Sequence, residues 1–122
     1  MARKKPINSR NKGARGEREL SSLLNEKYGY ETRRGQQYCG ANGDADVVGV
    51  NGLHIECKRV EKLNLDKAMA QAMDDARSGE IPAVFHRKDK DYWKVTVTLD
   101  DFMELWQVYE REVINNESLR GN

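Results

Sequence analysis

The stretch DVVGVNGLHIECK, which runs from Asp46 to Lys58, decides the fold of this 122-residue chain. Its residues are mostly apolar, small or β-branched, and they surround an Asn-Gly pair, so the stretch predicts a β-hairpin in buried sheet. An acid stands at the start of this hairpin, and Glu56 and Lys58 stand on its second strand. Charged groups in a buried strand pair carry a desolvation cost that folding alone rarely justifies, which indicates a functional site.

The length of the turn determines whether the two acids share a face of the sheet. Successive strand residues point to opposite faces, so Glu56 and Lys58 point the same way. A two-residue Asn-Gly turn would put Asp46 on the other face. A three-residue loop at 50–52, with Gly52 in the left-handed conformation, would put Asp46 directly across from Glu56. We expect the three-residue loop, because it also aligns the apolar side chains on the opposite face, which are Val47, Leu53, Ile55 and Cys57.

Length and composition indicate one folded domain. The chain is 34% charged and 38% hydrophobic, with its hydrophobic residues in periodic blocks, and its length supports a single core. We expect a basic flexible arm at 1–12, the domain at 13–114 and a frayed tail at 115–122. No apolar run approaches a membrane span and no signal-peptide pattern is present, so we expect a cytoplasmic location, in the host if the chain is phage-encoded. The two cysteines, Cys39 and Cys57, match neither a disulfide framework nor a zinc pattern.

The charge is segregated along the chain. The formal net charge is +1, but residues 1–18 hold seven of the 21 basic residues and a single acid. Such an arm is attracted to polyanions, although a solubilising tail would look the same. Because the arm leads directly into a helix with a further candidate site residue, we favour nucleic acid as its partner.

The periodicity predicts the element order α-β-β-β-α-β-β-α, an α/β fold with a mixed central β-sheet flanked by helices. The expected elements are a helix at about 13–28, a strand at 30–34, a Gly-rich loop at 35–44, the hairpin, a helix at 66–77, strands at 81–86 and 92–97, and a last helix that begins at Thr98 or Asp100. The last helix carries an apolar side that includes Trp106, and we expect Trp93 and Trp106 in the core.

Glu17 is a third acid that points inward. It precedes Leu20 by three residues and Leu24 by seven, so on a helix it shares their buried face. An inward acid near the start of a helix can also be a structural cap that interacts with the helix dipole. Because Asp46 and Glu56 on the hairpin would need a further partner around a metal ion, we treat Glu17 as a candidate site residue.

These features together resemble the PD-(D/E)XK nuclease superfamily, most closely the archaeal-type Holliday junction resolvases and their phage-encoded relatives. The resemblance covers about residues 12–98 and rests on the helix with Glu17, the Gly-rich loop, Asp46-Val47-Val48 and Glu56-Cys57-Lys58. Ala45 stands where the family often has proline. Asp44 is a competing candidate in the loop, and we favour Asp46.

The resemblance implies a restriction-endonuclease-like core and a metal-dependent DNA endonuclease. Asp46, Glu56 and the main-chain carbonyl of Cys57 would ligate Mg²⁺ or Mn²⁺. Glu17 would bind the metal or tune its bound water. Lys58 would orient or deprotonate the attacking water, or stabilise charge on the phosphate. His54 shares the face of Glu56, but a lone strand histidine is more often structural than catalytic.

The resemblance also implies branched DNA, such as a four-way junction, as the substrate, and a homodimer, because paired cuts need two sites. Contacts with phosphate would give affinity without reading sequence. The expected DNA-binding residues are Lys4, Lys5, Arg10, Lys12, Arg15, Arg33, Arg34 and Gln71. The alternatives are another phage endonuclease of this superfamily acting on branched or duplex DNA, a non-catalytic DNA-binding protein, and a basic-tailed structural protein of a phage particle.

Overall fold

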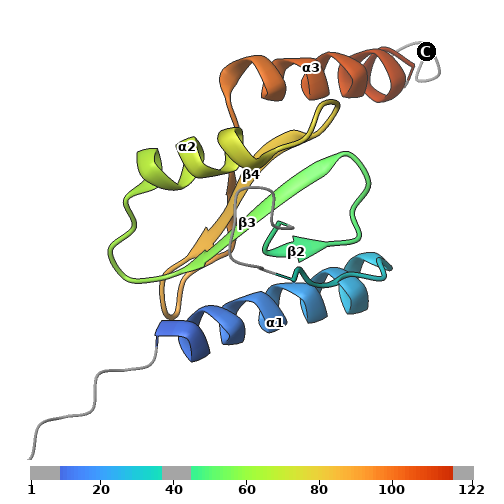
Figure 1. The fold of residues 1–122 in the computed structure, drawn as a ribbon. Helices are drawn as coiled ribbons and strands as arrows, with labels where there is room; N and C mark the ends of the chain where they lie inside the picture. The colour runs from blue at the N-terminus through green and yellow to red at the C-terminus, as the bar shows by residue number, and fades with distance from the viewer. Residues whose placement is uncertain (1–8, 37–44, 117–122) are drawn as a thin grey trace, which may run out of the picture.

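The computed structural model describes residues 9–36 and 45–116, and the main chain alone for residues 9–12. A five-stranded mixed sheet, in the strand order β1-β2-β3-β4-β5, separates α1 from α2 (Figure 1). The expected fold class and element order are thus confirmed. The elements are α1 Ser9–Tyr28, β1 Arg33–Arg34, β2 Val47–Val48, β3 Leu53–Arg59, α2 Leu65–Asp75, β4 Ile81–Arg87, β5 Lys94–Thr96, α3 Leu99–Tyr109 and the π-helical turn η1 Glu110–Ile114. None of the described helices is long and apolar enough to cross a membrane.

The first helix begins earlier than the sequence indicated. It starts at Ser9, so residues 9–12, which we expected in the flexible arm, are helical. No glycine or proline lies between Ser9 and Lys12, and the helix therefore extends from its anchored part without a break. At its other end the helix stops at Tyr28, and Gly29 takes a φ of 77°, as expected for the residue after a helix. The arm before residue 9, the loop at 37–44 with Cys39, and the tail after residue 116 lie outside the described residues.

The hairpin has the predicted register at Val47, but its turn is not the predicted three-residue loop. Val47 pairs with Ile55 in the antiparallel β2–β3 ladder. The Leu53 amide donates to the Val50 carbonyl at 3.2 Å, which closes a two-residue turn at Asn51 and Gly52, with a φ of 85° at Gly52. Between this turn and Val47 the chain passes through Gly49, whose φ is 118°, and one extra residue on this side of the hairpin shifts the register. β3 then runs parallel to β4, and β5 returns antiparallel to β4.

The first strand is shorter than expected because a side chain of α1 forms hydrogen bonds with the main-chain amide and carbonyl of Thr32, the residue that precedes β1. Asn25 Oδ1 accepts from the Thr32 amide at 2.7 Å, and Asn25 Nδ2 donates to the Thr32 carbonyl at 3.0 Å. The buried hydroxyls of Ser21 and Thr32 also lie 2.7 Å apart. A side chain thus replaces the sheet ladder at Thr32, and only Arg33 and Arg34 pair with β2.

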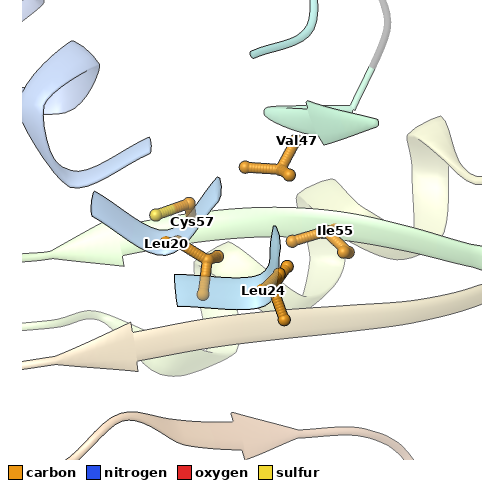
Figure 2. Packing of buried hydrophobic residues seen from close by; sticks show 5 residues of the cluster. All are labelled: Leu20, Leu24, Val47, Ile55 and Cys57. Atoms are coloured by element: carbon orange, nitrogen blue, oxygen red, sulfur yellow. The ribbon is translucent and has the colours of Figure 1, made fainter. Parts of the chain in front are cut away.

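The core under α1 is the apolar face of the hairpin. Leu20 and Leu24 of α1 pack against Val47, Ile55 and Cys57 (Figure 2). Burial raises the pKa of the Cys57 thiol, so this free cysteine stays protonated and packs as a small apolar group. The predicted alternation of the two strands is confirmed by this cluster.

The opposite face of the sheet carries α2. Ala68 and Ala72 are buried against Val84 of β4, and Val84 lies beside Glu56 in the parallel ladder. Asn64 caps the helix, with its side chain accepting from the Lys67 amide. Because small residues bring α2 close to the sheet, the polar face of the hairpin is next to this helix.

The last helix is amphipathic but not buried, which corrects the expectation that Trp106 belongs to the core. Trp106 is 39% exposed, and no residue of α3 is buried. Among the described elements α3 packs chiefly on η1, which continues it. In Figure 1 it lies beside one end of the sheet, where Leu105 lines a cavity together with Leu53 of β3 and Ile81 of β4. The periodic pattern predicts an apolar side of a helix, but it does not say what covers that side. Trp93, by contrast, is partly buried against the α1 core.

Gly49 offers a test of this hairpin. A Cβ at this position would lie 2.6 Å from the Glu31 carbonyl oxygen and 2.9 Å from the Thr32 Cα, and the φ of Gly49 is 118°. We expect Gly49→Ala to lower the free energy of unfolding by about 2–4 kcal/mol, because strain and a main-chain clash add. Gly52→Ala is the matched control: it has positive φ in open space and should cost about 1 kcal/mol. Equal midpoints in urea denaturation would contradict the close approach of the two segments.

Candidate functional site

Asp46 and Glu56 face each other on the side of the hairpin away from α1. Asp46 is held by two contacts with β3: its amide donates to the Ile55 carbonyl at 2.9 Å, and its Oδ2 accepts from the Cys57 amide at 2.8 Å. The two carboxyl groups lie within electrostatic reach, since the charge of Glu56 raises the pKa of Asp46. Each residue is only 6% exposed. The predicted pairing of these two acids therefore exists, in a setting that excludes water.

This setting favours a neutral Asp46 in the absence of a cation. Burial is the largest cause, the charge of Glu56 is the second, and Glu17 adds to them, so the pKa of Asp46 rises to about 7 even though the Cys57 amide favours the charged form. A buried carboxylate of this kind needs a proton or a cation. The donors are all oxygen atoms, which is the chemistry of a site for a hard divalent ion.

The raised pKa predicts an unusual pH dependence for metal-free protein. The folded state binds a proton at Asp46 more tightly than the unfolded state does, so its contribution is present below pH 4 and is lost as the pH rises to about 7. In the presence of a chelator, the stability of wild type relative to Asp46→Asn should fall over this range by roughly 1 kcal/mol per pH unit. Chemical denaturation of both proteins at pH 5, 6, 7 and 8 measures this difference. A difference that stays constant with pH would contradict the shift.

Glu17 points inward from α1, as its spacing predicted. It is buried, and its charge raises the pKa of Asp46, which places the two carboxylates within electrostatic reach. Arg34 of β1 donates from Nε to Glu17 Oε2 at 2.7 Å. The close approach of α1 to the sheet depends on Gly16, where a Cβ would lie 2.9 Å from the Cβ of Arg59. The structure therefore supplies Glu17 with a cationic partner next to the acid pair.

Lys58 follows Glu56 by two residues on β3, and it lies on the side of α2. It lines a cavity of about 220 Å³ together with Gln71 and Lys67 of α2. Gln71 Nε2 donates to Asp75 Oδ2 at 2.6 Å. Gln71 and Lys58 thus line one cavity, and the expected role of Gln71 stays a prediction.

His54, for which we expected a structural role, lies in direct contact with Glu56. It is 3% exposed, and its Nε2 lies 2.9 Å from Glu56 Oε1. The hydrogen bond to Glu56 is the main reason that the pKa of His54 is raised. The available signal was strand parity, because His54 precedes Glu56 by two residues and must share its face.

A second set of charges ties α1 to the far ends of the parallel strands. Arg59 and Arg87 are register partners on β3 and β4. Each lies 3.1 Å from a different oxygen of Glu19 on α1. These three residues come from three separate elements, so no local spacing in the sequence predicts that they pair. This network fixes α1, and with it Glu17, relative to the hairpin.

The expected DNA-binding residues are only partly described. Lys4 and Lys5 lie outside the described residues, as do the side chains of Arg10 and Lys12. Arg15 is exposed on α1, and Arg33 and Arg34 are exposed on β1. Gln71 is exposed on α2. The basic residues whose side chains are described therefore lie on α1 and β1, the two elements that also carry Glu17 and its partner.

Comparisons with known proteins identify a family and a similar solved structure. A family model described as "Phage putative PDDEXK endonuclease" matches residues 8–120. Among solved structures, Hjc of Archaeoglobus fulgidus, a Holliday junction resolvase from an archaeal hyperthermophile, is 25% identical and aligns over 70% of this chain and 72% of its own, with a TM-score of 0.48. No curated protein matches the chain.

Proposed function

Because the chain belongs to the phage PDDEXK endonuclease family, we propose that it is a metal-dependent nuclease that hydrolyses phosphodiester bonds in branched DNA. The observation that carries this proposal is the pair of buried carboxyl groups of Asp46 and Glu56, whose charges interact, with Lys58 on the strand face of Glu56. A protein that only binds DNA has no use for such a pair, whereas a divalent cation held here would assist phosphodiester hydrolysis.

In the proposed site, Asp46, Glu56 and the main-chain carbonyl of Cys57 would hold Mg²⁺ or Mn²⁺. The fit rests on the donor set, which consists of oxygen atoms, and on the raised pKa of Asp46, which burial and the charge of Glu56 cause and which a bound cation would reverse. When bound, the ion would acidify a water molecule and offset charge on the scissile phosphate. The Cys57 amide keeps the Asp46 carboxylate oriented, because it donates to Oδ2.

The remaining residues have distinct proposed roles. Lys58 provides a point charge that contacts the phosphate and orients the attacking water. Glu17 binds or tunes the water on the ion. Arg34 holds Glu17 in place through its 2.7 Å hydrogen bond, and it is exposed enough to contact DNA as well. Gln71 supports the site from the cavity that it shares with Lys58.

Recognition of DNA shape is proposed because the basic residues offer phosphate contacts. Arg15, Arg33 and Arg34 are exposed on α1 and β1. Arg10 and Lys12 belong to the start of α1, and Lys4 and Lys5 precede this helix in the sequence. Contacts of this kind give strong salt dependence but no base readout. A substrate that is defined by its branching fits such a surface.

We further propose that the active species is a homodimer that forms through α3. Each chain supplies one acid pair, so paired cuts in a junction need two copies. The exposed apolar side of α3 is an aromatic ladder, in which Phe102 and Trp106 stack at 6.3 Å and Trp106 and Tyr109 lie 5.3 Å apart. Two such faces related by a two-fold axis cover each other, as isologous dimers do.

The dimer is testable by mass. We expect wild type to elute at twice the 14.0 kDa of one chain in size-exclusion chromatography with light scattering. Phe102→Glu combined with Trp106→Glu should give monomers, because both side chains are exposed in the monomer and their change leaves its core intact. Glu104→Lys, on the opposite side of α3, is the charged control and should remain dimeric. A monomeric wild type at micromolar concentration would refute this interface.

The proposed function is tested by cleavage of labelled four-way junction, flap, single-stranded and linear duplex DNA with Mg²⁺ or Mn²⁺. Paired nicks across the junction support a junction-selective enzyme. Cutting of other DNA would retain the nuclease and change its substrate. Tight binding without any cutting would replace the enzyme by a non-catalytic DNA-binding protein.

A further inference from the structure

We propose that His54, Glu56 and Asp75 form a second divalent-cation site, which shares Glu56 with the oxygen-ligand site described above and takes a cation that accepts nitrogen, such as Mn²⁺ or Zn²⁺. The proposal rests on the proposed function only through this shared carboxylate. It adds a ligand type that the site at Asp46 does not contain.

The three side chains come together from two elements. His54 and Glu56 lie two residues apart on one face of β3, and Asp75 is the last residue of α2. One ligand atom from each of the three lies within 4.8 Å of those of the other two. Tight packing of Ala68 and Ala72 on β4 fixes α2 and thereby holds Asp75 over the strand.

The spacing of His54 and Glu56 fits a shared cation. Their Nε2 and Oε1 atoms are 2.9 Å apart. Ligand atoms that bind one small divalent ion at about 2.1 Å, at right angles to each other, are separated by about 3 Å. A cation can therefore replace the proton between these two atoms with little movement of the strand.

Two further polar residues lie next to the ligand set. The other nitrogen of His54, Nδ1, lies 3.8 Å from Glu80 Oε1, which is too far for a hydrogen bond but leaves the carboxylate within electrostatic reach of the ring. On the other ligand, Gln71 Nε2 donates to Asp75 Oδ2 at 2.6 Å. Glu80 and Gln71 lie outside the proposed ligand set.

A cation can reach the cluster although His54 is almost fully buried. A cavity of about 380 Å³ opens beside it, with His54, Asp75, Arg77 and Glu80 in its wall. This cavity is larger than a hydrated ion needs, and it is distinct from the 220 Å³ cavity at Lys58. The imidazole nitrogen favours Zn²⁺, whereas the two carboxylates of the cluster also suit Mn²⁺.

Electron spin-echo envelope modulation of bound Mn²⁺ tests the site directly, because it detects a nitrogen nucleus in the ligand shell. The probe is Mn²⁺ alone, with tag-free protein at two equivalents of metal. The chain has two histidines, so the source of a nitrogen signal can be assigned. We expect ¹⁴N coupling in wild type and in His86→Gln, and none in His54→Gln.

Asp75→Asn is the second variant, because it changes a partly exposed helix end and keeps the buried histidine. It should weaken Mn²⁺ binding at this site roughly tenfold or more, as seen in a titration of free Mn²⁺ by its electron paramagnetic resonance signal. Absence of ¹⁴N coupling in wild type, or its persistence in His54→Gln, would overturn the proposal.

The same samples separate this proposal from the proposed function. Asp46→Asn should keep the nitrogen coupling, since Asp46 is not a ligand of this site. Coupling in a wild type that cuts no DNA would refute the nuclease and support the second site. If wild type cleaves DNA but shows no nitrogen coupling, the second cation site is refuted and the proposed nuclease function is supported.

Discussion

Asp46→Asn is expected to reduce metal-dependent DNA cleavage by roughly a thousandfold or more. The substitution removes the charge on one of two carboxylates that face each other in a site that excludes water. A neutral amide is a poor ligand for a hard cation, and burial makes the missing charge more costly than it would be at a surface. The loss should appear mainly in the rate of the chemical step, because the exposed basic residues that would bind DNA are unchanged.

The fold of this variant should be retained, which makes the result interpretable. An asparagine side chain has nearly the shape of aspartate, and its oxygen can still accept from the Cys57 amide. It carries no charge opposite Glu56, so the repulsion that raises the pKa of Asp46 is removed. We therefore expect Asp46→Asn to be at least as stable as wild type above pH 7 without metal.

The measurement is single-turnover cleavage of a labelled junction at saturating protein, with Mg²⁺ and with Mn²⁺. The control is Asp44→Asn, two residues earlier in the chain, which should cleave within a few-fold of wild type. If Asp44→Asn were inactive and Asp46→Asn active, the two acids would exchange roles. Wild-type cleavage rates in both variants would show that Asp46 has no part in the reaction.

The hairpin shows what can be predicted from a sequence of this kind. Side-chain alternation leaves only two possible registers, and the requirement for one apolar face selects between them. The observed pair of Val47 with Ile55 confirms that choice. Glu17 is similar, because its spacing from Leu20 on one helix fixes its direction without any knowledge of the rest of the fold. Local periodicity was sufficient to predict the direction of a side chain wherever a single helix or hairpin determines that direction.

The remaining features depend on packing between elements. Asp75 approaches His54 only because α2 crosses the sheet at a particular position, and no spacing in the sequence encodes that crossing. The short first strand results from Asn25, which lies on another element and binds both main-chain groups of Thr32. The exposed side of α3 has the same periodicity as a buried one. The roles of Glu17, Asp46, Glu56 and Lys58 stay predictions until activity is measured.

Lys58→Gln is expected to reduce cleavage by about a hundredfold to a thousandfold, while metal binding is preserved. Lys58 shares the strand face of Glu56 but is not a ligand, so its removal should change the stabilisation of the phosphate and the attacking water alone. Lys58→Arg should restore little of the activity, because a planar guanidinium cannot take the place of a compact ammonium group.

Lys67→Gln is the matched control for this prediction. Lys67 lines the same cavity as Lys58 but extends from α2, with a similar charge and a more exposed position. If the cavity only collects positive charge for DNA binding, both variants should weaken binding equally and should be rescued by low salt. If Lys58 acts on the reacting phosphate, only Lys58→Gln should lower the single-turnover rate at saturating protein, and low salt should not restore it. The comparison therefore separates a catalytic ammonium group from a general electrostatic contribution of the same cavity.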